Sequence, residues 1–264
     1  MPDVATTVAP EDKTWLQAAG LLDLDALFTR ADLVAVKAKL TDRQTLSVAL
    51  PEGRVVFVKR YPKVKPPGML RRSPFSSPAA REYEALRRLA ELGVPTIHPL
   101  ALLEERQGKR VTRAALLTLG LDAPQTLEQL VLAGLSARRR QALARQLAQV
   151  TRRMHDGGVN HRDYYLVHLR VGQSDRLFVT DLNRADLRRE VPRRWVVKDL
   201  AALQFSAPAG VVTRTDRARF LGAYTGKPLR ACRSLVKAIL RKAAAMRANT
   251  ARKVARGEAN YHLR

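Results

Sequence analysis

The chain carries the segment VNHRDYYLVHL at residues 159–169, directly after the glycine pair 157–158. Asp181 lies eighteen positions after Asp163 and directly follows the apolar, strand-like residues 177–180. The two carboxylates are therefore expected at the ends of neighbouring short elements. Such a pair suits phosphoryl transfer, because one carboxylate accepts the proton of an attacking hydroxyl and the other holds a divalent ion on nucleotide phosphates.

A lysine and two glutamates upstream form a second candidate set. Lys59 ends the apolar strand-like run VVFVK, and Glu82 and Glu84 lie in a segment with helical spacing. Ser77 and Pro78 mark the start of that helix, as an N-cap followed by proline at the first helical position. A strand lysine paired with a helix glutamate would orient the phosphates of a nucleotide.

Each of these signals is weak when taken alone. A His-Arg-Asp triplet arises by chance, Asp181 could form a turn, and Lys59 could be a solvated residue at a strand edge. Their order along the chain is more specific. Strand lysine, helix glutamate, long helix, His-Arg-Asp loop and strand-end aspartate follow one another as in a kinase-type fold.

The pattern of elements predicts an α+β protein with two lobes. We place a small first lobe at residues 1–119, with an antiparallel sheet and one key helix, and a larger, mainly helical second lobe at residues 120–264. The expected elements are a short helix at 15–28, strands within 31–60, an exposed proline-rich loop at 61–78, a helix from Pro78 to Gly93, strands at 96–104 and 110–119, helices at 126–133 and 136–155, and a basic C-terminal helix.

Four segments together resemble the lipopolysaccharide core heptose kinase family (WaaP/RfaP and InaA type), a divergent branch of the protein-kinase-like fold. The similarity runs from about Val55 to Tyr224. The segments that carry it are VVFVKR, VNHRDYYLVHL, VTDLNRADLRRE and RRWVVKDLAALQFSA. The resemblance implies a bilobal kinase-like fold, with ATP and Mg²⁺ as cofactors.

The resemblance also implies roles for individual residues. Asp163 would be the catalytic base toward a sugar hydroxyl, and Asp181 would bind magnesium. Lys59 would hold the α and β phosphates, with Glu82 as its partner and Glu84 as the second choice. The two glutamates differ by about 200° around a helix, so only one can face the lysine. The Arg-Glu-Tyr context of Glu82 is more similar to the family.

The position five residues after Asp163 departs from common kinases, which have a metal-binding asparagine there. His168 occupies it here, and the heptose kinase family resembles this chain in that respect. His168 is therefore a candidate metal ligand, although imidazole suits magnesium poorly and could instead hydrogen-bond Asp163 or a phosphate. His161 and Arg162 are expected to hold the loop in place.

Three other segments have open interpretations. The turn at residues 40–45 has no glycine, so side chains such as Thr41 would have to replace backbone contacts to phosphates. The adenine-binding hinge is expected near residues 118–121. Lys198 and Asp199 either support the catalytic loop or form an ion pair at a helix start.

The composition limits the class of protein. The chain has 264 residues, with 48 Lys plus Arg against 24 Asp plus Glu, giving a net charge of +24. Hydrophobic residues make up 46%, which indicates a folded body and not a disordered basic tail. The single cysteine excludes an internal disulfide. We expect a cytoplasmic protein, since no apolar run approaches the length of a membrane span and the first residues lack a signal-peptide pattern.

A strongly positive charge usually indicates one of three kinds of partner: a nucleic acid, an anionic membrane surface or a polyanionic substrate. Aromatic residues make up only 5%, which disfavours single-stranded nucleic acid. Beyond residue 187 there are 19 basic and 4 acidic residues, a net charge of +15. The segment from Arg188 to Arg219 and the C-terminal helix are therefore candidate docking surfaces.

The leading hypothesis is an ATP-dependent kinase that phosphorylates a heptose hydroxyl of the lipopolysaccharide inner core. Its acceptor would be an anionic glycolipid, reached at the inner face of the cytoplasmic membrane without a membrane span. The alternatives are a kinase for a protein or another small molecule, a basic nucleic-acid-binding protein, and an inactive scaffold of the same fold.

Overall fold

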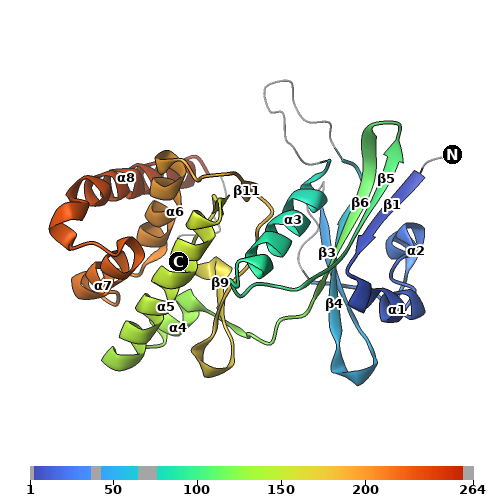
Figure 1. The fold of residues 1–264 in the computed structure, drawn as a ribbon, viewed down its shortest axis with the longest axis horizontal. Helices are drawn as coiled ribbons and strands as arrows, with labels where there is room; N and C mark the ends of the chain where they lie inside the picture. Colours follow the sequence, from blue (N-terminus) through green and yellow to red (C-terminus); the bar gives the residue numbers. More distant parts are fainter. Residues whose placement is uncertain (1–2, 37–42, 65–75, 258–264) are drawn as a thin grey trace. The chain divides into compact units, whose positions relative to one another are not determined.

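A computed structural model describes residues 3–36, 43–64 and 76–257, and in it the chain forms two compact units (Figure 1). The first unit contains residues 1–90, 97–121 and 182–184, and the second contains residues 91–96, 122–181 and 185–264. Each unit therefore includes a short segment whose neighbours in the chain belong to the other.

The described residues combine one large antiparallel sheet with a helical second half, as an α+β protein requires. The strands are β1 Asp3–Val8, β2 Val34–Ala35, β3 Gln44–Ala49, β4 Val55–Tyr61, β5 Pro99–Gln107, β6 Arg110–Leu119, β7 Gln125–Thr126, β8 Val159–Asn160, β9 Leu169–Val171, β10 Leu177–Val179 and β11 Asp186–Leu187. The helices are α1 Pro10–Ala18, α2 Leu24–Thr29, α3 Pro78–Glu91, α4 Leu127–Leu132, α5 Ala137–Asp156, α6 Arg193–Ser206, α7 Arg214–Thr225 and α8 Arg233–Ala255.

The first unit is a six-stranded sheet in the order β1-β5-β6-β4-β3-β2, with helices on both faces. Side chains alternate between the two faces of a strand, so each face builds its own core. One core joins α1 and α2 to the sheet through residues such as Leu16, Leu27, Val58 and Leu117. The other joins α3 to the sheet through residues such as Tyr83 and Leu116.

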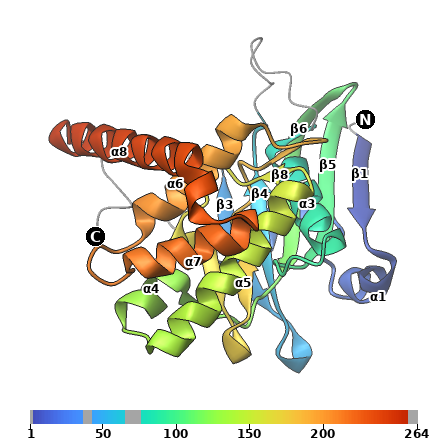
Figure 2. The ribbon, with the colours of Figure 1, turned by 60° about the vertical axis from the view of Figure 1, so that its left-hand side comes forward.

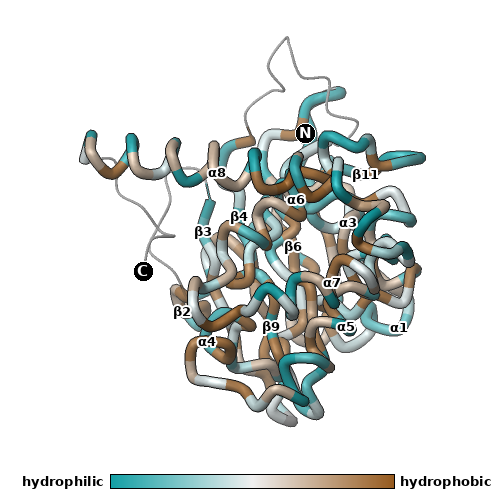
Figure 3. Tube along the Cα trace, turned by 90° about the vertical axis from the view of Figure 1, so that its left-hand side faces the viewer, coloured by the Kyte–Doolittle hydropathy of each residue, from teal (hydrophilic) through white to brown (hydrophobic). Residues whose placement is uncertain are grey.

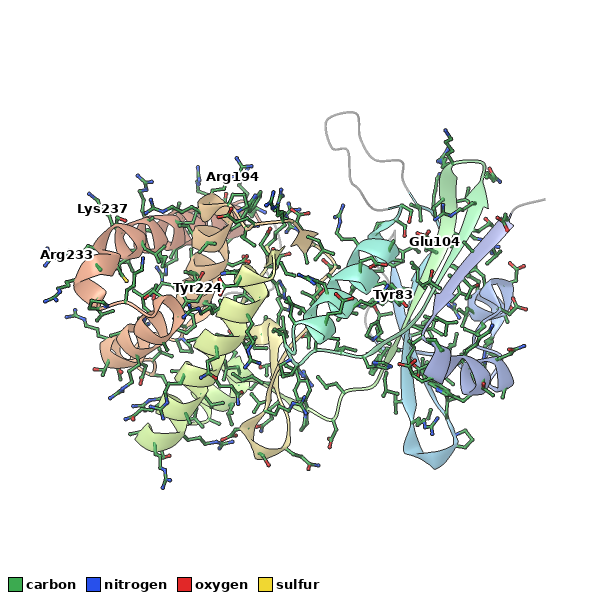
Figure 4. The ribbon with its side chains drawn as sticks, in the orientation of Figure 1. Tyr83, Glu104, Arg194, Tyr224, Arg233 and Lys237 are labelled. Atoms are coloured by element: carbon green, nitrogen blue, oxygen red, sulfur yellow. The ribbon has the colours of Figure 1, made fainter. Side chains whose placement is uncertain are left out.

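Helix α3 begins where the sequence predicts. The Ser77 hydroxyl accepts a hydrogen bond from the Ala80 amide at 3.0 Å, and Pro78 is the first helical residue. The Ser77 hydroxyl also donates to the buried Glu104 carboxylate of β5 at 2.5 Å, so the sheet holds the start of this helix (Figure 4). The helix start is therefore fixed both by its own cap and by the strand beside it.

The first unit holds more secondary structure than the sequence suggests. The single helix expected at 15–28 is two helices, α1 and α2, separated at Gly20, whose φ of 65° is left-handed. Strand β1 was not expected, and it pairs antiparallel with β5 at one end of the sheet. Residues 40–42 of the glycine-free turn expected at 40–45 lie outside the described residues, and residues 44–45 begin β3. Residues 65–75, most of the proline-rich loop expected at 61–78, also lie outside the described residues.

The second unit is mainly helical, as expected. The apolar face predicted for the helix at 136–155 is buried in α5, where Leu143, Leu147, Val150 and Met154 are each at most 8% exposed. Helices α5 and α7 pack together, as do α6 and α8. Figure 2 shows α8 extending past α6, and Figure 3 shows polar residues recurring along α8. In the described part of the chain no helix combines the length and apolar character needed to span a bilayer.

Candidate functional site

The structure places Lys59 of β4 beside Glu82 of α3. Lys59 lies opposite Leu116 in the β4–β6 register, and Leu116 belongs to the core under α3, so the lysine points to the helix face. Its Nζ donates to Glu82 Oε1 in an ion pair. The Glu82 side chain is 2% exposed, whereas Glu84 is 41% exposed and lies 3.8 Å from Arg87. Glu82, and not Glu84, is the partner of Lys59.

The segment expected to be the hinge, residues 118–121, begins with the last two residues of β6 and is attached to β4, the strand of Lys59. The Gly120 amide donates to the Val55 carbonyl at 2.6 Å. A Cβ atom at Gly120 would lie 2.9 Å from that same oxygen, a distance that Cβ atoms do not adopt. The absence of a side chain at Gly120 therefore allows the chain leaving β6 to lie against the beginning of β4.

The loop that carries Asp163 is held from below by a buried carboxylate of α6. Asp199 is fully buried; its Oδ2 accepts the His161 amide at 2.7 Å and its Oδ1 accepts the Arg162 amide at 2.8 Å. Arg162 has a φ of 71°, a left-handed conformation that costs free energy for a residue with a side chain. The two hydrogen bonds to Asp199 hold the backbone in that conformation directly before Asp163.

The sequence left two interpretations of Asp199 open, support for the loop or an ion pair at a helix start. The interpretation of Asp199 as support for the loop that carries Asp163 is confirmed by these hydrogen bonds. Lys198, its neighbour, lies instead over the Trp195 ring at 5.5 Å from the centroid. Sequence reasoning did not find the next residues of this network: His155 of α5 lies 3.4 Å from Asp199 and 2.8 Å from the Tyr224 hydroxyl of α7.

A second tether joins the loop to the strand that leads to Asp181. His161 Nε2 lies at hydrogen-bonding distance, 2.9 Å, from the Thr180 carbonyl. The Thr180 amide and hydroxyl both donate to the His168 carbonyl, each at 2.9 Å. These contacts continue the β9–β10 hairpin, in which Leu169 faces Val179. His168 is thereby brought next to Asp181.

Asp181 lies close to the His168 ring in the second unit. His168 Nδ1 lies 3.4 Å from Asp181 Oδ2, and the Asp181 side chain is 29% exposed. Asp181 has a φ of 62°, so the backbone turns sharply at this residue. Asp163 lies in the same loop as His168, and its carbonyl accepts the Tyr165 amide at 2.9 Å.

The donor set around Asp181 can be compared with the needs of magnesium. This ion takes oxygen ligands and is commonly held by one or two carboxylates together with substrate phosphates and water. The partly exposed carboxylate of Asp181 fits that requirement, and the His168 ring is suited to orient it by a hydrogen bond. The described residues contain no group of three or more His, Cys, Asp or Glu side chains that could hold a metal by themselves.

The residues after Asp163 anchor the loop in the helices of the second unit. Tyr164 is fully buried, and its hydroxyl lies 3.0 Å from the Thr151 hydroxyl of α5. Burial raises the pKa of Tyr164 well above its usual value, so this phenol stays neutral. The Leu166 amide donates to the Ser206 hydroxyl of α6 at 3.0 Å. The loop is thus fixed both before and after Asp163.

The second unit also has a large apolar cavity between its helices, which is open to solvent. It has a volume of about 1160 Å³ and is lined mainly by leucine, valine and isoleucine side chains of α4 to α8. Arg233, Lys237 and Arg241 of α8 also line it, and Figure 4 shows Arg233 and Lys237 on that helix. No pattern in the sequence predicts this cavity.

Comparisons with known proteins agree with the resemblance found in the sequence. The model of the lipopolysaccharide kinase (Kdo/WaaP) family matches residues 32–224. The lipopolysaccharide core heptose(I) kinase WaaP of Escherichia coli K12 is 34% identical over 176 residues, covering 62% of this chain and 66% of that protein. The protein of the same name from Pseudomonas aeruginosa is 38% identical over 163 residues, covering 58% and 61%. These alignments thus span about two thirds or less of those relatives.

A solved structure described as WaaP in complex with acyl carrier protein is similar over nearly its whole length. It aligns with a TM-score of 0.74 and 29% identity, and the alignment covers 91% of this chain and 98% of that one. The kinase-like fold expected from the sequence is confirmed by this match.

Proposed function

Because the chain belongs to the lipopolysaccharide kinase (Kdo/WaaP) family, we propose that it transfers the γ-phosphoryl group of ATP to a heptose hydroxyl of the lipopolysaccharide inner core. The relatives named as heptose(I) kinases support this choice of acceptor. Phosphoryl transfer depends chiefly on positioning and on stabilising charge, and the ordered charged groups described above suit both tasks.

In the first unit, Lys59 would bind the α and β phosphates of ATP. The buried Glu82 carboxylate holds the ammonium group in place, since a long lysine side chain otherwise samples many rotamers. Residues 118–121 would contact the adenine.

In the second unit, Asp163 would orient the sugar hydroxyl and accept its proton as the oxygen attacks the γ-phosphorus. Asp181 would hold Mg²⁺, with His168 orienting its carboxylate. When bound, the ion would neutralise charge on the phosphate oxygens. The observation that carries the proposal is the pair of hydrogen bonds from the backbone before Asp163 to the buried Asp199, because they pre-organise the proposed base.

The test is phosphoryl transfer from labelled ATP to core lipopolysaccharide whose phosphates have been removed chemically. We expect Mg²⁺-dependent transfer by the wild type and a loss of about 100-fold or more in Asp163→Asn, the range for a general base. Asp156→Asn is the matched control, because the Asp156 side chain is 72% exposed. Its ion pair in the described structure is with Arg152, one helical turn away. Equal rates for the wild type and Asp163→Asn would refute the assignment.

Mass spectrometry of core oligosaccharide from cells with and without the gene would identify the acceptor. Loss of one phosphate group from the core supports the proposal. An unchanged core, combined with ATP turnover in vitro, would favour a protein or another small molecule as the acceptor. Salt-sensitive binding to DNA without any ATP turnover would favour a nucleic-acid-binding protein.

We also propose that this chain binds an acylated carrier protein. The similar WaaP structure is described as a complex with acyl carrier protein. An acyl chain is a hydrocarbon, and the apolar cavity of the second unit is large enough for one, while the cations of α8 suit a negatively charged carrier. Native mass spectrometry with acylated and unacylated carrier tests this. Ala144→Phe, which narrows the cavity, should weaken binding of the acylated form only, and Ala245→Phe on the exposed side of α8 should not.

The positive charge beyond residue 187 would bring the protein to the anionic inner face of the cytoplasmic membrane. Between Arg217 and Gly257 the chain has 12 basic and no acidic residues. Sedimentation with vesicles that contain phosphatidylglycerol should show binding that salt weakens. Binding to neutral phosphatidylcholine vesicles at the same level would contradict an electrostatic attraction.

A further inference from the structure

Asp186 connects the two stretches of the second unit that carry Asp163 and Asp181. It lies five residues after Asp181 in β11, and the β11–β8 register places it opposite Asn160. Its Oδ2 lies 3.4 Å from Nη1 of Arg162, the residue directly before Asp163. One carboxylate therefore links the backbone after Asp181 to the loop before Asp163.

The buried guanidinium group of Arg162 needs an acidic partner such as Asp186. Its side chain is 7% exposed, and its guanidinium carbon lies 5.2 Å from the centroid of the Trp195 ring. A cation that is nearly removed from water requires a charged or hydrogen-bonding partner, because burial otherwise costs several kcal/mol. Since Arg162 also has a left-handed backbone, any shift of its side chain acts on the peptide that presents Asp163.

A second cation holds Asp186 in place. Arg188 Nη2 lies 3.1 Å from the same Asp186 oxygen, and Arg188 Nε donates to the Asn160 side-chain carbonyl at 3.3 Å. Asp186 thus lies between Arg188, two residues further along the chain, and Arg162 of the loop. This arrangement fixes the carboxylate more firmly than one contact would.

We infer that Asp186 is a positioning residue which, through Arg162, sets the loop that presents Asp163 without any covalent modification. In kinases that are switched on by phosphorylation, a new phosphate group orders the activation segment by pairing with arginine. In this chain a carboxylate from the residues after Asp181 already pairs with the loop arginine. The inference rests on the proposed function, because it presupposes that the loop presents Asp163 for phosphoryl transfer.

The experiment compares wild type, Asp186→Asn and Asp186→Glu with ATP, Mg²⁺ and chemically dephosphorylated core lipopolysaccharide. Asp175→Asn is the matched control, because Asp175 also pairs with an arginine of the second unit, Arg139, away from this loop. We expect kcat of Asp186→Asn to fall about 10- to 100-fold, as for a catalytic group displaced by a fraction of an ångström to one ångström. The KM for ATP should change less than about twofold, and Asp186→Glu should recover most of kcat.

Two further measurements separate this inference from the proposed function. Amide hydrogen exchange in Asp186→Asn should be accelerated more at residues 161–163 than in α5 of the same variant, whether or not an acceptor is known. Treatment of the wild type with a protein phosphatase should leave kcat unchanged. An inactive wild type would refute the proposed function alone. An unchanged kcat and exchange rate in Asp186→Asn, or loss of activity after phosphatase treatment, would overturn the inference about Asp186.

Discussion

The two units hold their candidate functional groups in different ways. In the first unit, two side chains hold each other: Lys59 and Glu82 form an ion pair between a strand and a helix, both of which are regular elements. In the second unit, Asp163 and Asp181 lie in irregular segments, and Arg162 and Asp181 have left-handed backbones. There the backbone itself is fixed, by the hydrogen bonds to Asp199 and by the hairpin contacts of Thr180.

This difference predicts how substitutions in each unit affect ligand binding, activity and stability. A pair of side chains between regular elements can be lost without distorting the backbone, so its removal should affect the binding of a ligand more than the fold. A strained loop depends on every tether, because each bond that is lost allows the backbone to relax to a more favourable conformation. Substitutions of the tethers should therefore affect both activity and stability in the second unit.

The largest effect is expected for Asp199→Asn. The asparagine side chain keeps only one acceptor oxygen, so one buried amide loses its partner, at a cost of about 1–3 kcal/mol in unfolding free energy. Because the loop can relax, transfer to the acceptor should also fall about 100-fold. Urea unfolding and phosphoryl-transfer kinetics measure the two effects. If Asp199→Asn is as stable and as active as the wild type, the hydrogen bonds to Asp199 do not fix the conformation of the loop.

Glu82→Gln should have a large effect of another kind. The neutral amide no longer holds the ammonium group of Lys59 by charge, and we expect kcat/KM for ATP to fall at least tenfold, mainly through KM. Glu84→Gln is the matched control on the same helix, since Glu84 is 41% exposed. If both variants behave alike in ATP kinetics, the ion pair has no role in nucleotide binding.

Asp216→Asn should have a moderate effect that depends on pH. Asp216 caps α7 through Thr213 and lies 3.2 Å from Arg140. Burial raises the pKa of this carboxyl, but the hydrogen bonds from Thr213 and the charges of Arg140 and Arg219 outweigh it, and the pKa is lowered overall. We expect a loss of about 1–2 kcal/mol near neutral pH, the value of a helix cap.

The pH dependence follows from the direction of that shift. A carboxyl whose folded-state pKa is lowered stabilises the protein above its unfolded-state pKa of about 3.9. That contribution is lost as the pH falls through the lower folded-state value. Urea unfolding of the wild type and Asp216→Asn at several pH values should therefore give converging free energies in acid. A difference that stays constant as the pH falls would show that the carboxylate charge is not responsible.

The smallest effect is expected for Tyr164→Phe. The Thr151 hydroxyl, which faces the Tyr164 hydroxyl, also donates to the Leu147 carbonyl at 2.6 Å. Thr151 therefore keeps a partner when the phenol is removed, and the loss should be about 0.5–1.5 kcal/mol, the net value of one hydrogen bond. Activity should change less than about twofold. A larger loss of activity would show that this bond also acts as a tether of the loop.

Local signals in the sequence predicted the regular elements well. The Ser77 cap with Pro78 marks the start of α3, and the leucine periodicity of residues 143–154 marks the buried face of α5. Strand β1 was missed because most of its residues are exposed and do not form a buried apolar run. The two residues of β11 are too few to form a pattern, and their pairing with β8 depends on tertiary structure.

The candidate site could be predicted only in part. The sequence provided Lys59, Glu82, Asp163, His168 and Asp181 through their order and their resemblance to a family. It could not provide the contacts of Asp186 or of His155, because these join residues 24 to 69 positions apart. An acidic residue a few positions beyond Asp181 is the one signal that could have drawn attention to Asp186.

The exchange of segments between the two units has a consequence for how the protein is made. Residues 91–96 are completed early in synthesis but belong to the second unit, where Thr96 bonds to Val179. Residues 182–184 belong to the first unit but leave the ribosome only after much of the second has been made. Domains generally fold in order from the N-terminus during synthesis. Here the first unit acquires its last residues late, so the two units are expected to complete folding close together in time.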